Sequence, residues 1–112
     1  MAITLGNFKL ENNGSFQGTF KTLTVAATLT IVPNTKRSDN APDYRVYTGY
    51  QSEIGAGWNK VAKNSGETYV NLKIAVPEFG PRYIHMSLVR MAQEDNLGST
   101  HRLLWNPEDP KD

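Results

Sequence analysis

Residues that could support catalysis are few and scattered in this sequence. His85 and His101 stand far apart, and neither belongs to a ligand pattern such as HExxH or HxH, so we expect two ordinary strand residues. The chain has no cysteine, and no serine occurs in a G-x-S-x-G context, so no nucleophile is visible. Asp39 and Asp43 could form a carboxylate pair, but side chains that bond the backbone of their own turn explain them more simply. We therefore predict no catalytic site, no metal site, no cofactor and no enzymatic activity.

A second group of residues suits binding. Residues 57–74, GWNKVAKNSGETYVNLKI, read as a hairpin rich in aromatic and basic side chains, and YRVYTGY (44–50) precedes it. Proteins hold single-stranded nucleic acid with aromatic rings that stack on bases, worth roughly 1–3 kcal/mol per base, and with Lys and Arg that contact phosphates. We predict such a nucleic-acid-binding face from Tyr44, Arg45, Tyr47, Trp58, Lys60, Lys63, Tyr69 and Lys73.

The same residues also have a purely structural explanation. Trp58 would suit the core of a small domain equally well, and tyrosine rings commonly pair across strands. Lysine on a strand discourages aggregation between sheet edges. The sequence therefore leaves open whether Trp58 is a core or a surface residue.

The elements that must position these residues are strands. Apolar and polar residues alternate through GSFQGTFKTL (14–23), TVAATLTIV (24–32) and ETYVNLKIAV (67–76), which is the period of a half-buried strand. Turn residues such as NNGS (12–15) and NSG (64–66) recur at roughly ten-residue spacing. This spacing predicts an all-β domain of about eight short strands, a small curved sheet, barrel or sandwich with OB-like character.

Alternation also assigns the faces of the central segment. Tyr44 and Val46 fall on one side of their strand, with Arg45 and Tyr47 on the other. In the next segment Ile54, Ala56 and Trp58 share a face, and the intervening Gly55 and Gly57 indicate a bulge or a close backbone approach. We further predict a first strand at 7–10, a strand within 82–91 and a last strand within 100–106.

Composition sets the class of protein. The 112 residues, 38% of them hydrophobic and 21% charged, with a net charge of +1, fit a single soluble domain at 1–106. No apolar run approaches the roughly 18 residues of a membrane span, and the N-terminus does not resemble a secretory signal, so we expect a cytoplasmic protein that does not contact membranes. Residues 107–112, PEDPKD, are expected to form a flexible acidic tail.

Several phrases together resemble a known family. GNFKLENNGSFQGTFKTLTVAATLTIVP, SDNAPDYRVYTG, EIGAGWNKVAKNSGETYVNLKIAVPEF and a late LLWN are similar to the bacterial family catalogued as domain of unknown function 736. The resemblance covers residues 6–106, and SDNAPDYRV is its most specific element; AVPEFGPRYIHM and VRMAQEDNLGSTHR depart from the usual pattern. The family is cytoplasmic, is often encoded on plasmids and other mobile elements, and has no established activity. The resemblance therefore implies a mobile-element context and no particular chemistry.

The leading hypothesis is a non-enzymatic accessory protein of a plasmid or other mobile element that binds single-stranded nucleic acid. The alternative is a protein-protein interaction module that modulates a host or mobile-element partner complex, because functional residues concentrate on loops held by rigid sheets. Its contact loop would comprise Lys36, Arg37, Asp39, Asn40 and Asp43. Exposed strand edges also make a homodimer plausible.

Overall fold

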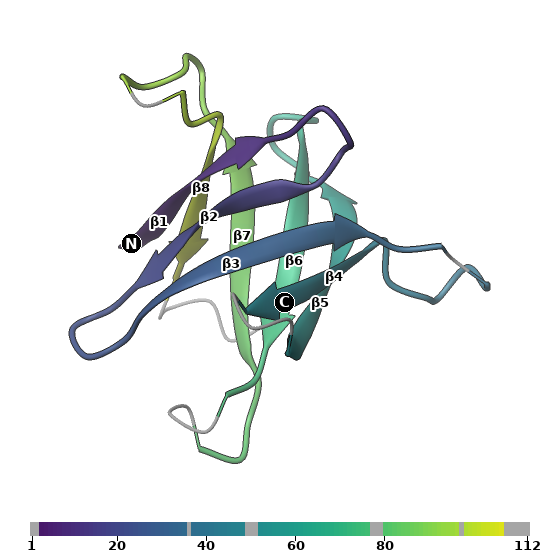
Figure 1. Ribbon diagram of the computed structural model, residues 1–112. Helices are drawn as coiled ribbons and strands as arrows, with labels where there is room; N and C mark the ends of the chain where they lie inside the picture. The colour runs from purple at the N-terminus through teal and green to yellow at the C-terminus, as the bar shows by residue number, and fades with distance from the viewer. Residues whose placement is uncertain (1–2, 36, 49–51, 77–79, 97, 107–112) are drawn as a thin grey trace.

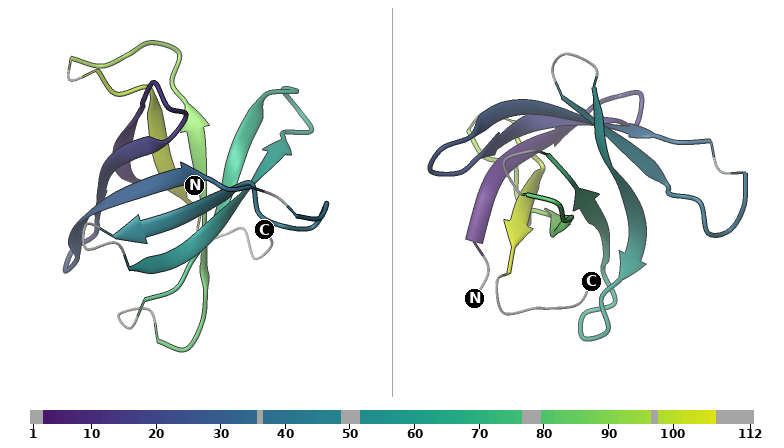
Figure 2. Two further views of the ribbon diagram at one scale, coloured as in Figure 1. Left: turned by 45° about the vertical axis from the view of Figure 1, so that its right-hand side comes forward. Right: turned by 90° about the horizontal axis from the view of Figure 1, so that it is seen from below.

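Eight antiparallel strands make up the part of the chain that the structure describes. The computed structural model describes residues 3–35, 37–48, 52–76, 80–96 and 98–106. The strands are β1 (Ile3–Leu10), β2 (Phe16–Lys21), β3 (Ala26–Pro33), β4 (Tyr44–Thr48), β5 (Glu53–Val61), β6 (Thr68–Ile74), β7 (Ile84–Arg90) and β8 (His101–Trp105). Each strand pairs with the next one along the chain, and β8 pairs with β1, so the sheet closes into a barrel (Figures 1 and 2).

This architecture confirms the prediction of an all-β domain with about eight short strands. The OB comparison holds only for the general form, because an OB fold is a five-stranded Greek-key barrel, whereas here the strands follow one another up and down. Closure also removes the exposed strand edges on which the expected homodimer depended, at least among the described strands. A dimer would need another surface.

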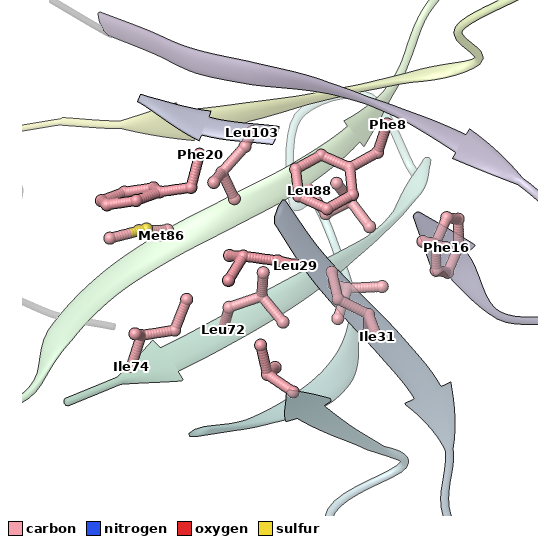
Figure 3. Close-up of a cluster of buried hydrophobic side chains, with 12 residues drawn as sticks. Phe8, Phe16, Phe20, Leu29, Ile31, Leu72, Ile74, Met86, Leu88 and Leu103 are labelled. Atoms are coloured by element: carbon pink, nitrogen blue, oxygen red, sulfur yellow. The ribbon is translucent and has the colours of Figure 1, made fainter. Parts of the chain in front are cut away.

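Alternation along each strand builds the core. Partners such as Phe16 and Ile31, or Leu72 and Met86, lie opposite one another and point into the barrel, as the sequence pattern predicted for β2, β3 and β6. Fully burying a large apolar side chain of this kind contributes about 1.5–3 kcal/mol. The buried cluster, most of which Figure 3 labels, comprises Phe8, Phe16, Phe20, Leu29, Ile31, Val46, Val70, Leu72, Ile74, Met86, Leu88 and Leu103.

Two glycines decide which way β5 faces. Gly57 lies opposite the buried Leu72 and Gly55 lies opposite the buried Ile74, so both glycines occupy inward positions. A Cβ on Gly55 would stand 2.3 Å from the backbone oxygen of Lys73, which shows how closely the two strands approach. The register of β4 and β5 also shifts next to Gly55. Both the predicted bulge and the predicted close approach are confirmed, and Trp58 consequently lies on the outside of the barrel.

Several strand boundaries differ from those that the sequence indicated. β1 begins at Ile3 rather than at residue 7, because its first half pairs with β8, a strand far away in the sequence. The strands predicted within 82–91 and 100–106 are confirmed as β7 and β8. The predicted tail, 107–112, lies outside the described residues, and those that are described include no helix suited to crossing a membrane.

The connections define two ends of the barrel. Because the strands run alternately up and down, the connections 11–15, 34–43, 62–67 and 91–100 belong to one end of the barrel, which we call the upper end. The other end, which we call the lower end, carries the connection 22–25, the starts of β1 and β7 and the end of β8.

Candidate nucleic-acid interface

The outer surface of β5, β6 and β7 presents aromatic, basic and polar side chains in three rows. Lys60 lies opposite Tyr69 in the first row. In the second row Asn71 lies between Trp58 of β5 and Ser87 of β7. In the third row Lys73 lies between Ala56 of β5 and His85 of β7. Cross-strand partners have Cβ atoms about 4.5–5.5 Å apart, so the rows form one continuous surface. We call it the Trp58 face, defined by Trp58, Lys60, Tyr69, Asn71, Lys73, His85 and Ser87.

A hollow of about 390 Å³ opens beside this face. Trp58 and Tyr83 both line it, and small residues, including Ala56 and Ala75, leave space between the larger side chains. The Lys73 Nζ lies 4.8 Å from the centre of the Tyr83 ring, within the range of a cation–π contact. The remaining lining residues are Glu53, Ile54 and Gly55. Two aromatic side chains with an ammonium group beside them could hold a planar ring and an adjacent anion.

The connection from β3 to β4 holds the edge of Trp58. The backbone N–H of Asp43 donates to the carbonyl of Gly57 at 2.9 Å, and the N–H of Asn59 donates to Asp43 Oδ2 at 2.9 Å. The indole Nε1 of Trp58 donates to the carbonyl oxygen of Asn40 at 3.3 Å. Bonds from the 34–43 connection therefore flank Trp58 on both sides along β5 and orient its half-buried ring.

The base of the same connection is also fixed. The side-chain amide of Asn34 donates to the carbonyl of Pro42 at 2.9 Å and accepts a bond of 2.8 Å from Arg45 Nε. The N–H of Asn34 donates to the carbonyl of Asp43 at 2.9 Å. Pro42, Asp43 and Arg45 of the segment SDNAPDYRV thus take part in a structural clasp between β3, β4 and β5.

The residues predicted for a protein-contact loop divide between this clasp and its tip. Asp43 belongs to the clasp, and Asn40 contributes its carbonyl oxygen to Trp58 while remaining exposed. Arg37 and Asp39 are exposed at the tip, and Lys36 lies outside the described residues.

The other residues predicted for nucleic-acid binding do not all lie together. Tyr47 and Arg45 point outward from β4, next to β5, as alternation predicted. Arg45 Nη1 contacts the carboxylate of Glu53 at 3.1 Å, so part of its charge is already neutralised. Lys63 is exposed in the 62–67 turn at the upper end.

Tyr44 does not lie on the outer surface of the barrel with Trp58. Its ring points into the upper end of the barrel, 5.8 Å from the ring of Phe16 in an edge-on arrangement, and it packs against the core. It therefore cannot share a ligand with Trp58 on the outer face. Side-chain alternation had already assigned Tyr44 and Tyr47 to opposite sides of β4. The predicted binding face nevertheless included both, because both are aromatic.

Tyr83, which lies just before β7 and is 57% exposed, was not predicted as a site residue from the sequence. The signal that could have revealed it is its two-residue spacing from His85, which places both on one side of an extended segment. His85 lies opposite Lys73, and its Nδ1 is buried with no hydrogen-bond partner among the described residues.

His101 lies apart from the Trp58 face, at the upper end of the barrel. Its ring packs edge-on against Phe16 at 4.7 Å, and its Nδ1 lies 2.8 Å from the hydroxyl of Thr100. Burial, followed by the positive charge of Arg90, lowers the pKa of His101 from its ordinary value of 6.5. Within the described ranges, His, Asp and Glu side chains form no group of three or more that could hold a metal ion.

The fold and this surface define a class, a small closed up-and-down β-barrel with an aromatic and basic outer face. The chain belongs to the family described as "Protein of unknown function (DUF736)", whose model matches residues 4–108. The resemblance seen in the sequence is therefore confirmed. No curated protein and no solved structure shows a significant match to the chain.

Proposed function

We propose that this protein is a non-enzymatic, cytoplasmic accessory protein of a plasmid or other mobile element that binds single-stranded nucleic acid through the Trp58 face. The observation that carries the proposal is the position of Trp58, outward on β5, beside Lys73 and the hollow shared with Tyr83. The mobile-element context follows from the family resemblance alone.

The chemistry of the face suits an unpaired strand. Trp58, Tyr69 and Tyr83 offer rings for stacking, which is tolerant of sequence because every base has a π-face. Lys60 and Lys73 stand among these rings, where they could contact phosphates. Glu53, which also lines the hollow, is paired with Arg45. Duplex DNA hides its base faces, so the proposal predicts a preference for single strands.

Fluorescence anisotropy with labelled oligo-dT, RNA and duplex DNA tests the proposal directly. We expect the wild type to bind single strands in a salt-dependent manner. Trp58→Ala should weaken binding about 5- to 150-fold, which corresponds to the loss of one stacked base at about 1–3 kcal/mol. Trp58→Phe, which retains a ring, should lose less. Circular dichroism and thermal melting of each variant show whether it folds.

A matched lysine pair isolates the charge contribution. Lys73→Gln should reduce the slope of log K against log salt by about 0.7, the value for one phosphate contact on a single strand. Lys9→Gln makes the same charge change on β1, across the barrel from β5, and should leave the slope unchanged. Absence of wild-type binding at low salt, or equal effects of the two lysine variants, would refute the proposal.

A second candidate function is the protein-protein interaction module, with a host or mobile-element complex as partner. The observation that favours it is the exposed tip of the 34–43 connection, where Arg37, Asp39 and Asn40 project from a base held by several hydrogen bonds. Pull-down from host lysate with and without nuclease separates the two functions. A partner that survives nuclease and is lost in Arg37→Ala/Asp39→Ala favours the module, and light scattering tests self-association.

A further inference from the structure

The lower end of the barrel contains a pocket that the proposed function does not use. Its volume is about 580 Å³, within the range of roughly 300–1,000 Å³ that is typical of small-molecule sites. Its lining comes from the starts of β1 and β7, the ends of β2 and β8 and the 22–25 connection. The lining residues are Ile3, Thr4, Leu5, Phe20, Lys21, Thr22, Leu23, Ile84, Met86 and Trp105.

The core closes the inner side of this pocket. Phe20 and Met86 are both almost completely buried, and Figure 3 shows them side by side at one end of the core cluster. They therefore form a boundary between the packed interior and the pocket. Eight-stranded barrels are just wide enough either to fill with side chains or to hold one small ligand. Side chains fill this barrel over most of its length, and the pocket at its lower end leaves room for a small ligand.

The outer rim exposes apolar side chains to water. Leu23 is fully exposed and Ile3 is 39% exposed, although both line the pocket. Grouped apolar exposure of this kind around a concavity is typical of a binding site, whereas single exposed apolar residues are common. An apolar ligand would cover these side chains and Trp105 together.

Among the described residues that line the pocket, Lys21 is the only charged one. It is exposed at the end of β2, and the other polar lining residues are Thr4 and Thr22. Thr22 is already engaged in its turn, since its Oγ1 accepts from the N–H of Val25 at 3.2 Å. A ligand with an aliphatic body and one negatively charged end would match both the apolar lining and the single ammonium group.

We propose that the pocket formed by Ile3, Leu23, Met86 and Trp105 binds a free aliphatic carboxylate, with the chain in the pocket and the carboxylate beside Lys21. The site lies at the lower end of the barrel and does not share a residue with the Trp58 face. It is therefore independent of nucleic-acid binding.

Isothermal titration calorimetry of the wild type with dodecanoate, below its micelle concentration, is the primary test. We expect saturable binding with one site per chain. Trp58→Phe leaves Trp105 as the one remaining tryptophan, so its emission should change along the same binding curve. No binding, or binding without a change in Trp105 emission, would overturn the proposal.

Substitutions at two exposed apolar residues, one in the pocket lining and one outside it, distinguish binding in the pocket from general adsorption of dodecanoate to the surface. Leu23→Asp places a charge in the pocket lining without removing a buried side chain, and it should weaken dodecanoate binding at least tenfold. Val61→Asp makes the same kind of change at a 65% exposed residue near the upper end, and it should have no effect. Equal effects of the two variants would show adsorption and overturn the site.

The charged end of the ligand is tested with a neutral analogue. Lys21→Gln should weaken binding of dodecanoate several-fold and leave binding of dodecanol unchanged, whereas Lys9→Gln should alter neither. If dodecanol binds as tightly as dodecanoate and Lys21→Gln has no effect, the carboxylate assignment is wrong. Equal weakening by Lys9→Gln would show a general charge effect and would also refute it.

Discussion

Alanine substitutions at Gly55 and Gly57 should have clearly different costs, although the two residues are neighbours on the inner side of β5. At Gly55 the new Cβ would stand 2.3 Å from the Lys73 backbone oxygen, and backbone can move only if the strands separate. At Gly57 the nearest atoms are methyl groups, Leu72 Cδ2 at 2.7 Å and Val70 Cγ1 at 2.9 Å, which can shift by rotating the side chains.

The magnitudes follow from these contacts. Overpacking against movable side chains costs about 1–3 kcal/mol, and replacing glycine recovers about 0.4–1 kcal/mol from the unfolded chain. Gly57→Ala should therefore lower the free energy of unfolding by about 0–2.5 kcal/mol. Gly55→Ala should cost more than about 3 kcal/mol, the upper end of ordinary overpacking, because its clash is with backbone.

Urea denaturation followed by circular dichroism measures both values. The comparison depends on the difference between two variants of identical chemistry, so the unfolded-state contribution largely cancels. Equal destabilisation, or a greater cost at Gly57, would refute the reasoning that backbone contact between β5 and β6 sets the position of Trp58.

Three further predictions concern stability. Leu72→Ala removes a fully buried side chain and should lower the free energy of unfolding by about 2–5 kcal/mol in urea titrations. A double-mutant cycle on Arg45 and Glu53 should give a coupling below about 1 kcal/mol, since both side chains are exposed; a larger value would contradict this. Because the folded state lowers the pKa of His101, the unfolded chain binds its proton first, so stability should fall as the pH drops below 6.5. His101→Gln should reduce that fall, and an unchanged pH profile would exclude this cause.

Much of the barrel could be predicted from side-chain alternation. Phe16, Phe20 and Leu72 were assigned to buried faces because their neighbours are polar and the period is two. Turn residues located most connections. The pairing of β1 with β8 could not be predicted in this way, because neither strand carries a local signal for a partner so distant in the sequence.

The direction of Trp58 shows where the pattern fails. Ile54, Ala56 and Trp58 form the apolar phase of β5, which ordinarily marks the buried side. Here the buried side consists of Gly55 and Gly57, whose missing side chains leave space for residues of the neighbouring strands. The alternation of apolar and polar side chains identifies a buried face only when that face carries apolar side chains. It therefore cannot identify the buried face of β5, where the inward residues are glycines.

The seam between β1 and β8 has a consequence for the order of folding. Every other strand pair joins segments that follow one another along the chain, whereas Ile3 pairs with Trp105, almost the full length of the chain away. Closing so long a loop costs conformational entropy before the contacts repay it, and it slows folding. We therefore expect the hairpins to form first and the seam last. A circular permutant that joins the two ends and opens the 64–66 turn would make the seam a local hairpin, and the same barrel should then fold along a different route.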